Sequence, residues 1–358
     1  MFLFFMLFRL LLSPGDSSPW WSVQTGGLDT NLRGVSVKSW GTGYNVWASG
    51  SNGVILRSTN DGETWKQLSV AGAGDLDFRD IEAFDPDRAY VMSSGDGHAS
   101  RIYKTTDGGT SWKLQYSGTR TGFFLDSLDC DSSTHCLALS DPVDGKFLVL
   151  TTEDGEHWNE LPRDKMPAAL PKEGAFAASG TAIALCEGGI YFGTGGPKAR
   201  IFHSADNGRS WTVTETPISS GNPSSGVFSI ACDGPDTLLA VGGDYNQPGR
   251  ADRVSVYSPD AGKTWQLSAL QPGGYRSAVG SFSYGDFAAV GPNGTDVSKD
   301  QGVHWQHTDH LNLNAVSFDG TEGWAVGPEG TIARFKTHWF YSIRNHESTR
   351  RPAPAQTD

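Results

Sequence analysis

The sequence has few cysteines and lacks the short motifs that mark common cofactor and metal sites. Its 358 residues contain four cysteines and no Cys-x-x-Cys pair, so zinc and thioredoxin-like chemistry have no ligands of the usual spacing. A P-loop, a Gly-x-Ser-x-Gly elbow and a dinucleotide fingerprint opening a helix are also missing. His304, His307 and His310 do not form a metal motif, because strand alternation sends the first two to opposite faces. We therefore predict no cofactor and no metal site.

Positive charge is scarce as well. The chain has 28 lysines and arginines against 40 aspartates and glutamates, a formal net charge of -12. Neutralising phosphates and adsorbing to anionic lipids both require a surplus of lysine and arginine. We therefore expect neither nucleic acid nor an anionic membrane surface as a partner.

Long hydrophobic runs are absent. The N-terminal run MFLFFMLF before Arg9 is too short to span a bilayer comfortably. It is similar to the apolar core of a signal peptide, but a basic leading segment and a small-x-small cleavage site are missing. We interpret residues 1–18 as signal-peptide-like or disordered. We expect a periplasmic or secreted protein with no integral membrane span; the alternative is a frayed apolar tail on a cytosolic protein.

Glycine and tryptophan are plentiful, with 45 and 12 residues, and no long window shows helical periodicity. This composition favours a turn-rich all-β fold. One eight-residue pattern recurs six times, as STNDGETW, TTDGGTSW, TTEDGEHW, SADNGRSW, SPDAGKTW and SKDQGVHW. The final tryptophans, Trp65, Trp112, Trp158, Trp211, Trp265 and Trp305, are 40 to 54 residues apart. Each interval has room for four short strands.

The residues of this pattern suit a tight turn between two strands. The third-position side chain can accept hydrogen bonds from backbone N–H groups of the turn, and the glycine permits positive φ. The tryptophan can bury a large ring between neighbouring sheets. The third-position residues are Asn60, Asp107, Glu153, Asp206, Asp260 and Asp300. We interpret them as structural.

The six segments resemble the Asp-box (BNR) repeat, which implies a β-propeller of four-stranded antiparallel blades. Residues 312–335 read as the first three strands of a further repeat without a box. Residues 20–24 resemble the strand that follows each box and can supply the missing fourth strand. The predicted fold is therefore an all-β, seven-bladed β-propeller over residues 19–336, closed by the N-terminal strand. Residues 337–358 are interpreted as a flexible tail.

Within this class, the chain resembles the Ycf48-like photosystem II assembly and stability factors and their bacterial relatives. The segments that carry the likeness include FRDIEAFD, SDPVDGKFLVLTTEDG and GWAVGPEGTIARF. The resemblance implies an assembly factor that engages a protein, since members of this family are thought to present an arginine patch to a precursor protein.

Three arginines occupy equivalent places at the starts of predicted inner strands. We expect these strands to begin near Arg33, Arg79, Leu125, Phe176, Phe228, Arg276 and Asn314. Arg33, Arg79 and Arg276 fall on blades that are near neighbours around the ring, so they can converge at one channel mouth. Arginine suits bidentate binding of carboxylate or phosphate, and Tyr245 and Tyr275 are neighbouring aromatic candidates. Alternatively, each arginine pairs with a local acid, such as Arg79 with Asp80 or Glu82.

An enzymatic alternative is a sialidase-like glycoside hydrolase with a divergent active site. Such chemistry needs two facing carboxylates, and the candidates near the mouth are Asp80, Asp126, Glu173 and Asp244. Sialidases also carry an early Arg-Ile-Pro segment, which is absent here. We therefore favour a non-catalytic, monomeric binding or assembly scaffold with a protein or peptide partner.

The four cysteines form two groups. Cys130 and Cys136 flank a polar turn, DCDSSTHC, and can staple a hairpin in an oxidising compartment. Cys186 and Cys232 lie inside apolar runs, and we interpret them as buried free thiols.

Overall fold

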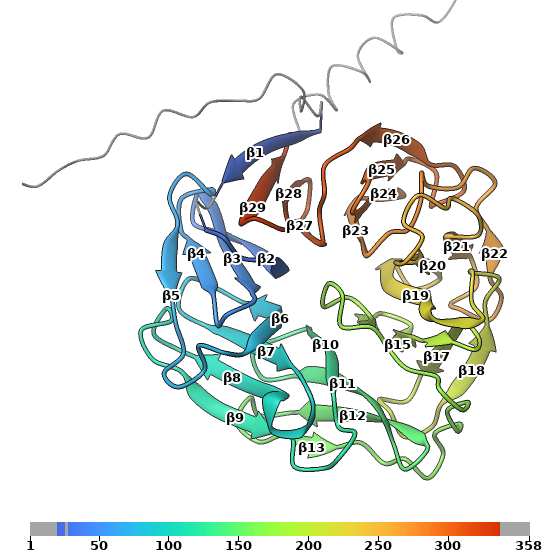
Figure 1. The fold of residues 1–358 in the computed structure, drawn as a ribbon, viewed down its shortest axis with the longest axis horizontal. Helices are drawn as coiled ribbons and strands as arrows, with labels where there is room; N and C mark the ends of the chain where they lie inside the picture. Colours follow the sequence, from blue (N-terminus) through green and yellow to red (C-terminus); the bar gives the residue numbers. More distant parts are fainter. Residues whose placement is uncertain (1–19, 26–27, 337–358) are drawn as a thin grey trace, which may run out of the picture.

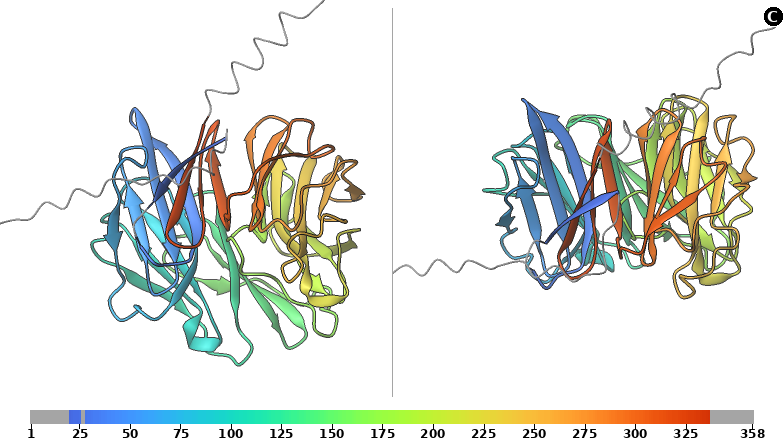
Figure 2. Two further views of the ribbon diagram at one scale, coloured as in Figure 1. Left: turned by 45° about the horizontal axis from the view of Figure 1, so that its top comes forward. Right: turned by 90° about the horizontal axis from the view of Figure 1, so that it is seen from above.

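The computed structural model describes residues 20–25 and 28–336 (Figure 1). Seven antiparallel sheets surround a central opening and form a β-propeller. The tilted and edge-on views of Figure 2 show the blades side by side in one layer. The predicted seven-bladed fold is thus confirmed. The interpretations of residues 1–18 and of the tail, 337–358, concern residues outside the described part.

The first four blades follow one another along the chain. Blade 1 contains β2 (Leu32–Trp40), β3 (Gly43–Gly50), β4 (Ile55–Ser58) and β5 (Lys66–Leu68). Blade 2 contains β6 (Asp77–Ala83), β7 (Ala89–Ser94), β8 (Arg101–Thr105) and β9 (Lys113–Ser117), with a short 3-10 turn, η1 (Gly97–Ala99). Blade 3 contains β10 (Leu125–Cys130), β11 (Cys136–Val143), β12 (Lys146–Thr152) and β13 (Asn159–Glu160). Blade 4 contains β14 (Ile183–Cys186), β15 (Gly189–Gly193), β17 (Arg200–Ser204) and β18 (Thr212–Glu215).

The remaining blades complete the ring. Blade 5 contains β19 (Asn222–Asp233), β20 (Thr237–Asp244), β21 (Ser255–Ser258) and β22 (Gln266–Leu267), and β16 (Gly195–Gly196) adds to its inner edge. Blade 6 contains β23 (Ala278–Ser283), β24 (Asp286–Gly291), β25 (Gly294–Ser298) and β26 (Gln306–Asp309). Blade 7 contains β27 (Ala315–Asp319), β28 (Glu322–Val326), β29 (Thr331–Phe335) and β1 (Trp21–Thr25).

The two ends of the propeller pair in blade 7. Strand β1 runs antiparallel to β29, and Trp21 lies opposite Phe335. The Trp21 ring contacts Phe335 edge-on at 5.2 Å between centroids, and its indole nitrogen donates a 2.9 Å hydrogen bond to Thr295 of blade 6. The predicted closure by the N-terminal strand is confirmed, and it pairs the outer edge of β29 that would otherwise be open.

The apolar core lies between adjacent blades. One cluster packs Trp47 and Leu68 of blade 1 against Phe78 and Val91 of blade 2. Trp112, at the end of the second box, contacts Trp47 of the preceding blade edge-on at 6.2 Å. The box tryptophan therefore joins two sheets, as the repeat predicts.

Five of the six box turns share one hydrogen-bond pattern. In the second turn, Thr105 Oγ1 accepts the Gly109 N–H at 2.9 Å and Asp107 Oδ1 accepts the Ser111 N–H at 2.9 Å. Gly109 has φ of 79°, and an added Cβ would collide with Leu68 of the preceding blade. Glycine is therefore required here for both backbone conformation and space.

The third turn corrects the assignment of Glu153. Asp154 Oδ1, one residue later, accepts the Glu156 and His157 N–H groups at 2.8 Å, and Thr152 Oγ1 accepts the Gly155 N–H at 2.9 Å. The Glu153 side chain is 76% exposed. This turn is one residue shorter than the others, so the shorter aspartate side chain occupies the accepting position.

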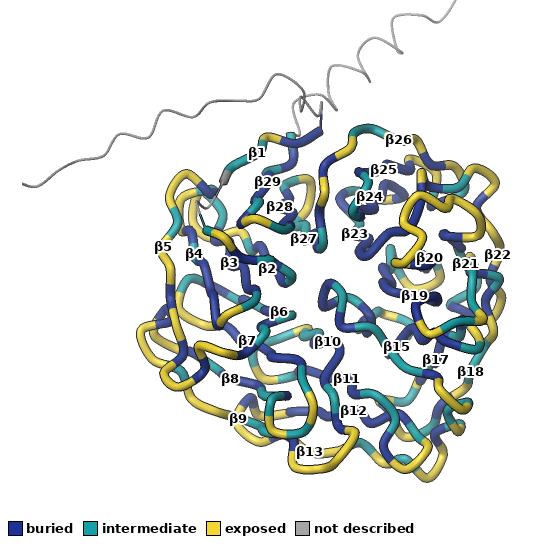
Figure 3. The backbone as a smooth tube through the Cα atoms, in the orientation of Figure 1, coloured by how far each residue is buried: buried dark blue, intermediate teal, exposed yellow. Residues whose placement is uncertain are grey.

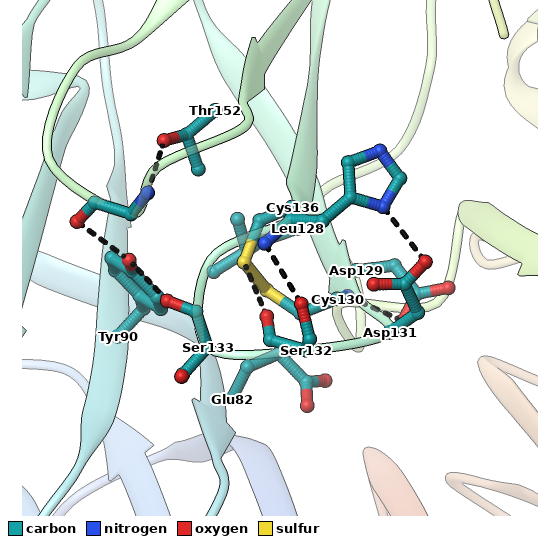
Figure 4. The surroundings of a disulfide bond; sticks show 12 residues. Glu82, Tyr90, Leu128, Asp129, Cys130, Asp131, Ser132, Ser133, Cys136 and Thr152 are labelled. Atoms are coloured by element: carbon teal, nitrogen blue, oxygen red, sulfur yellow. Dashed lines mark hydrogen bonds and ion pairs between the residues drawn. A yellow bond between two sulfur atoms is a disulfide. The ribbon is translucent and has the colours of Figure 1, made fainter.

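Both pairs of cysteines form disulfides. Cys130 and Cys136 face each other across β10 and β11 beside the turn that carries Ser132 (Figure 4). Cys186 of β14 is joined to Cys232 of β19, which links blades 4 and 5. The interpretation of Cys186 and Cys232 as free thiols is wrong, because sheet packing places two cysteines 46 residues apart on adjacent inner strands.

The strands account for nearly all regular structure in the described residues. Within that part of the chain, no helix has the length and apolar character needed to cross a bilayer.

Candidate functional site

A loop of blade 4, residues 174–182, enters the central opening. In Figure 1 it is the green segment that reaches toward the axis, and Figure 3 shows it as buried or half-buried. We call it the plug loop. The sequence predicts an inner strand starting near Phe176, but the first strand of blade 4 begins only at Ile183. The prediction of an inner strand at Phe176 is therefore wrong, and the intervening residues cross the opening.

Contacts to four other blades hold the plug loop in place. Ser179 Oγ donates to the Ser277 carbonyl of blade 6 at 2.8 Å, and the Thr181 and Ser229 hydroxyls lie 2.7 Å apart. Ser127 of blade 3 donates to the Gly180 carbonyl at 2.5 Å. Gly180 has φ of 79°, and an added Cβ would collide with the Asp80 carboxylate of blade 2.

The plug loop forms one wall of a pocket at the channel mouth. This mouth pocket has a volume of about 400 Å³ and is lined by residues of six blades and the loop. Phe176 of the loop stacks on Phe228 with 3.7 Å between ring centroids, and Tyr275 meets Phe228 edge-on at 4.8 Å. The pocket is therefore concave and aromatic on the side of blades 5 and 6.

Two of the three predicted arginines line this pocket. Arg79 Nε lies 2.7 Å from Asp77 Oδ2, and Arg79 Nη1 donates to the Ala177 carbonyl of the plug loop at 2.9 Å. Arg33 has no ion pair or hydrogen bond with any residue that the structure describes. Burial and the neighbouring Arg79 both lower the pKa of Arg33. An unpaired, half-buried guanidinium beside a second one favours an anionic ligand.

Arg276 does not line the mouth pocket with Arg33 and Arg79. Its side chain is fully buried and is paired with Asp296, with Arg276 Nε 2.6 Å from Asp296 Oδ2. Arg276 Nη1 also donates to the Tyr275 carbonyl at 2.9 Å. The expectation that Arg276 reaches the mouth is wrong, because a buried carboxylate on β25 draws the guanidinium into blade 6.

The two predicted tyrosines do line the mouth pocket, with different exposure. Tyr245 is 48% exposed at the rim, whereas Tyr275 is 5% exposed. Tyr245 therefore offers a face to a partner, and Tyr275 shapes the wall.

Of the four predicted carboxylates, only Asp126 lies in the mouth pocket. Asp141 of β11, which the sequence analysis missed, lies there too. Burial, followed by the charge of Asp141, raises the pKa of Asp126, and burial raises the pKa of Asp141 to about 6. Asp141 stands in the segment SDPVDG, where no spacing rule singles it out from other loop acids.

The other three carboxylates have local structural partners. Asp80 accepts the Leu128 N–H at 2.6 Å, and Asp244 accepts the Ser224 hydroxyl at 2.6 Å. Glu173 forms a buried ion pair with Arg200. Their proposed place at the mouth is wrong, because each satisfies backbone or side-chain groups of the blades.

The sequence of this chain also matches a known family. The family model described as Photosynthesis system II assembly factor YCF48 matches residues 9–272. The chain belongs to this YCF48 family. The match covers most of the propeller, including Arg33, Arg79 and both pocket carboxylates.

Solved YCF48 structures share the fold. YCF48 from Cyanidioschyzon merolae is 15% identical with a TM-score of 0.63, covering 89% of this chain and 99% of that one. A structure of YCF48 bound to D1 peptide is 13% identical with a TM-score of 0.58, covering 91% and 96%. A Paenibacillus xyloglucanase is 24% identical over 256 residues, which are 63% of this chain. The chain spans about a quarter of that xyloglucanase's length.

Proposed function

We propose that this chain is a non-catalytic scaffold that captures an anionic segment of a protein partner in the mouth pocket. Arg33 carries this proposal: it is a half-buried guanidinium that lines the pocket without an ion pair among the described residues. Buried charges are normally paired, and a carboxylate of a partner supplies the missing counterion.

Other features support a protein or peptide as the ligand. Tyr245 presents a half-exposed ring at the rim, and tyrosine and arginine are enriched at binding hot spots. A relative of the same fold, YCF48, has been solved bound to D1 peptide. We further propose a periplasmic or secreted location, supported by two disulfides of a kind that persists in oxidising compartments.

A peptide array tests the proposal. The same peptides are displayed once with a free terminal carboxylate and once as amides. The wild type should retain the free acids selectively, and Arg33→Ala should lose that selectivity. Arg250→Ala is the matched control, because Arg250 is exposed and pairs with Asp252 outside the pocket. Equal retention of acids and amides by the wild type would refute the proposal.

One observation favours a second candidate, a glycoside hydrolase. Asp126 and Asp141 share one pocket and both have raised pKa values. Such enzymes use two carboxyl groups, and the one that acts as the general acid has a raised pKa. The partial similarity to a xyloglucanase agrees with it. Hydrolysis of xyloglucan oligosaccharides or fluorogenic glycosides by the wild type, lost in both Asp126→Asn and Asp141→Asn, would establish the enzyme over the scaffold.

A further inference from the structure

The mouth pocket contains an acidic side as well as a basic one. Asp126 is 1% exposed, and its Oδ2 accepts no hydrogen bond from the residues that the structure describes. Asp141 Oδ1 accepts the Ala175 N–H of the plug loop at 2.9 Å. Leaving a buried carboxyl oxygen unsatisfied is costly. A cation beside the two carboxyls would also stabilise their charged forms against the burial that raises their pKa values, so this wall favours a ligand that brings a positively charged donor.

The aromatic wall of the same pocket suits a cationic donor. Phe176, Phe228 and Tyr275 form a continuous group of rings through one stacked and one edge-on contact. The faces of aromatic rings attract ammonium and guanidinium groups, and desolvation strengthens the attraction. Two carboxyls and several rings around one cavity are thus complementary to a basic side chain.

Basic and acidic side chains come from different blades of the pocket. Arg33 and Arg79 belong to β2 and β6, whereas Asp126 and Asp141 belong to β10 and β11 of the next blade. We infer that the mouth pocket binds a chain end that carries both a free carboxylate and a basic side chain, that is, a C-terminal lysine or arginine. This inference rests on the proposed function, since it uses the same arginines for the carboxylate.

The shape of the pocket favours a chain end over a folded surface. Its volume of about 400 Å³ is at the small end of the range for ligand pockets. The plug loop, residues 174–182, spans the opening through hydrogen bonds to blades 2, 3, 5 and 6. The loop therefore forms a wall of the pocket inside the opening, and a terminal residue can enter the pocket from the mouth.

The test uses four fluorescein-labelled pentapeptides with the common sequence Gly-Ser-Gly-Ala followed by a variable last residue. The last residue is lysine, acetyl-lysine or norleucine as the free acid, or lysine as the amide. Fluorescence polarisation with the full chain should show at least tenfold tighter binding of the lysine acid than of the other three. Acetyl-lysine keeps the N–H donor and the length, so it separates charge from hydrogen bonding.

Variants connect the preference to the acidic wall. Asp126→Asn should bind the lysine and norleucine acids equally, while Asp129→Asn, a half-buried acid on the same strand outside the pocket, should keep the preference. Circular dichroism confirms that each variant is folded, and Asp141→Asn provides a second change at the wall.

The outcomes separate this inference from the proposed function. Equal binding of the lysine and norleucine acids, with amide binding lost, overturns the basic subsite and leaves carboxylate capture standing. Equal binding of lysine acid and lysine amide overturns carboxylate capture itself. Binding of none of the four peptides overturns both.

Discussion

Arg276 Nε lies 2.6 Å from Asp296 Oδ2 in the interior of blade 6, and both side chains are at most 1% exposed. The equivalent Arg33 of blade 1 lines the mouth pocket without such a partner among the described residues. Two arginines that the repeat makes equivalent thus have opposite roles. One holds a blade together, and the other is available to a ligand.

Alanine substitutions should separate these roles. Arg276→Ala leaves a buried carboxylate unpaired and should lower the free energy of unfolding by about 3–5 kcal/mol. Arg33→Ala removes a desolvated charge beside Arg79 and should leave stability unchanged or slightly higher. Urea unfolding of both variants measures the difference. A loss of more than about 2 kcal/mol in Arg33→Ala would mean that Arg33 is structural.

The third box turn provides a matched pair of adjacent acids. Asp154→Ala removes the acceptor of two backbone N–H groups and should lower Tm by several degrees. Glu153→Ala removes an exposed side chain and should leave Tm nearly unchanged. Thermal unfolding followed by circular dichroism compares the two variants. A larger loss of Tm in Glu153→Ala than in Asp154→Ala would show that Glu153 is the structural acid of this turn.

The two disulfides should contribute unequally to stability. Cys186 and Cys232 are 46 residues apart, whereas Cys130 and Cys136 are 6 apart. The loop-entropy relation gives about 4 kcal/mol for the longer loop and about 2 kcal/mol for the shorter. Double serine variants of each pair, unfolded in guanidinium chloride, test this ranking. Equal losses would show that chain entropy in the unfolded state does not dominate.

Stability should depend on pH through Glu82, a half-buried acid of blade 2 that lies near Asp129 of blade 3. Burial, and then the charge of Asp129, raises the pKa of Glu82 to about 8. Asp80 also has a raised pKa, and Lys38 and Ser36 face Glu82 with the opposite effect. The folded state binds the proton of Glu82 more tightly than the unfolded state does. The stability that this proton adds is therefore complete below about pH 4.5 and is lost as the pH rises through 8.

Unfolding at a series of pH values should therefore show wild-type stability falling between pH 5 and pH 9. Glu82→Gln keeps the shape of the side chain but cannot titrate. Its loss of unfolding free energy over this pH range should be smaller than that of the wild type by at least about 1 kcal/mol. Parallel curves for the two proteins would show that Glu82 does not titrate in this range.

The repeated turns made most of the fold predictable. Hydroxyl, carboxylate, glycine and tryptophan act within eight residues, so local hydrogen bonding and steric limits determine each turn from sequence. The spacing of these turns then indicated six blades. The boxless repeat at residues 312–335 added a seventh, and the resemblance of Trp21 to post-box residues identified its closing strand. Even here the register of the third turn was missed, since TTEDG offers two hydroxyls and two acids at adjacent positions.

The mouth pocket was only partly predictable. Arg33 and Arg79 were found from their equivalent places in the repeat, and the same argument placed Arg276 wrongly. Asp141, the plug loop and the Cys186–Cys232 disulfide had no local signal, because each depends on residues of other blades.

The sequence alone determined which segments turn, which strands follow and how many blades close the ring, because those properties depend on contacts within or between neighbouring repeats. Only the tertiary structure decided which arginine is buried, which carboxyls share a cavity and which loop spans the opening. These properties depend on charge pairing and space at the axis, where residues far apart in the chain meet. Asp296, 20 residues beyond Arg276, pairs with that arginine inside blade 6, whereas no acid among the described residues forms an ion pair with Arg33.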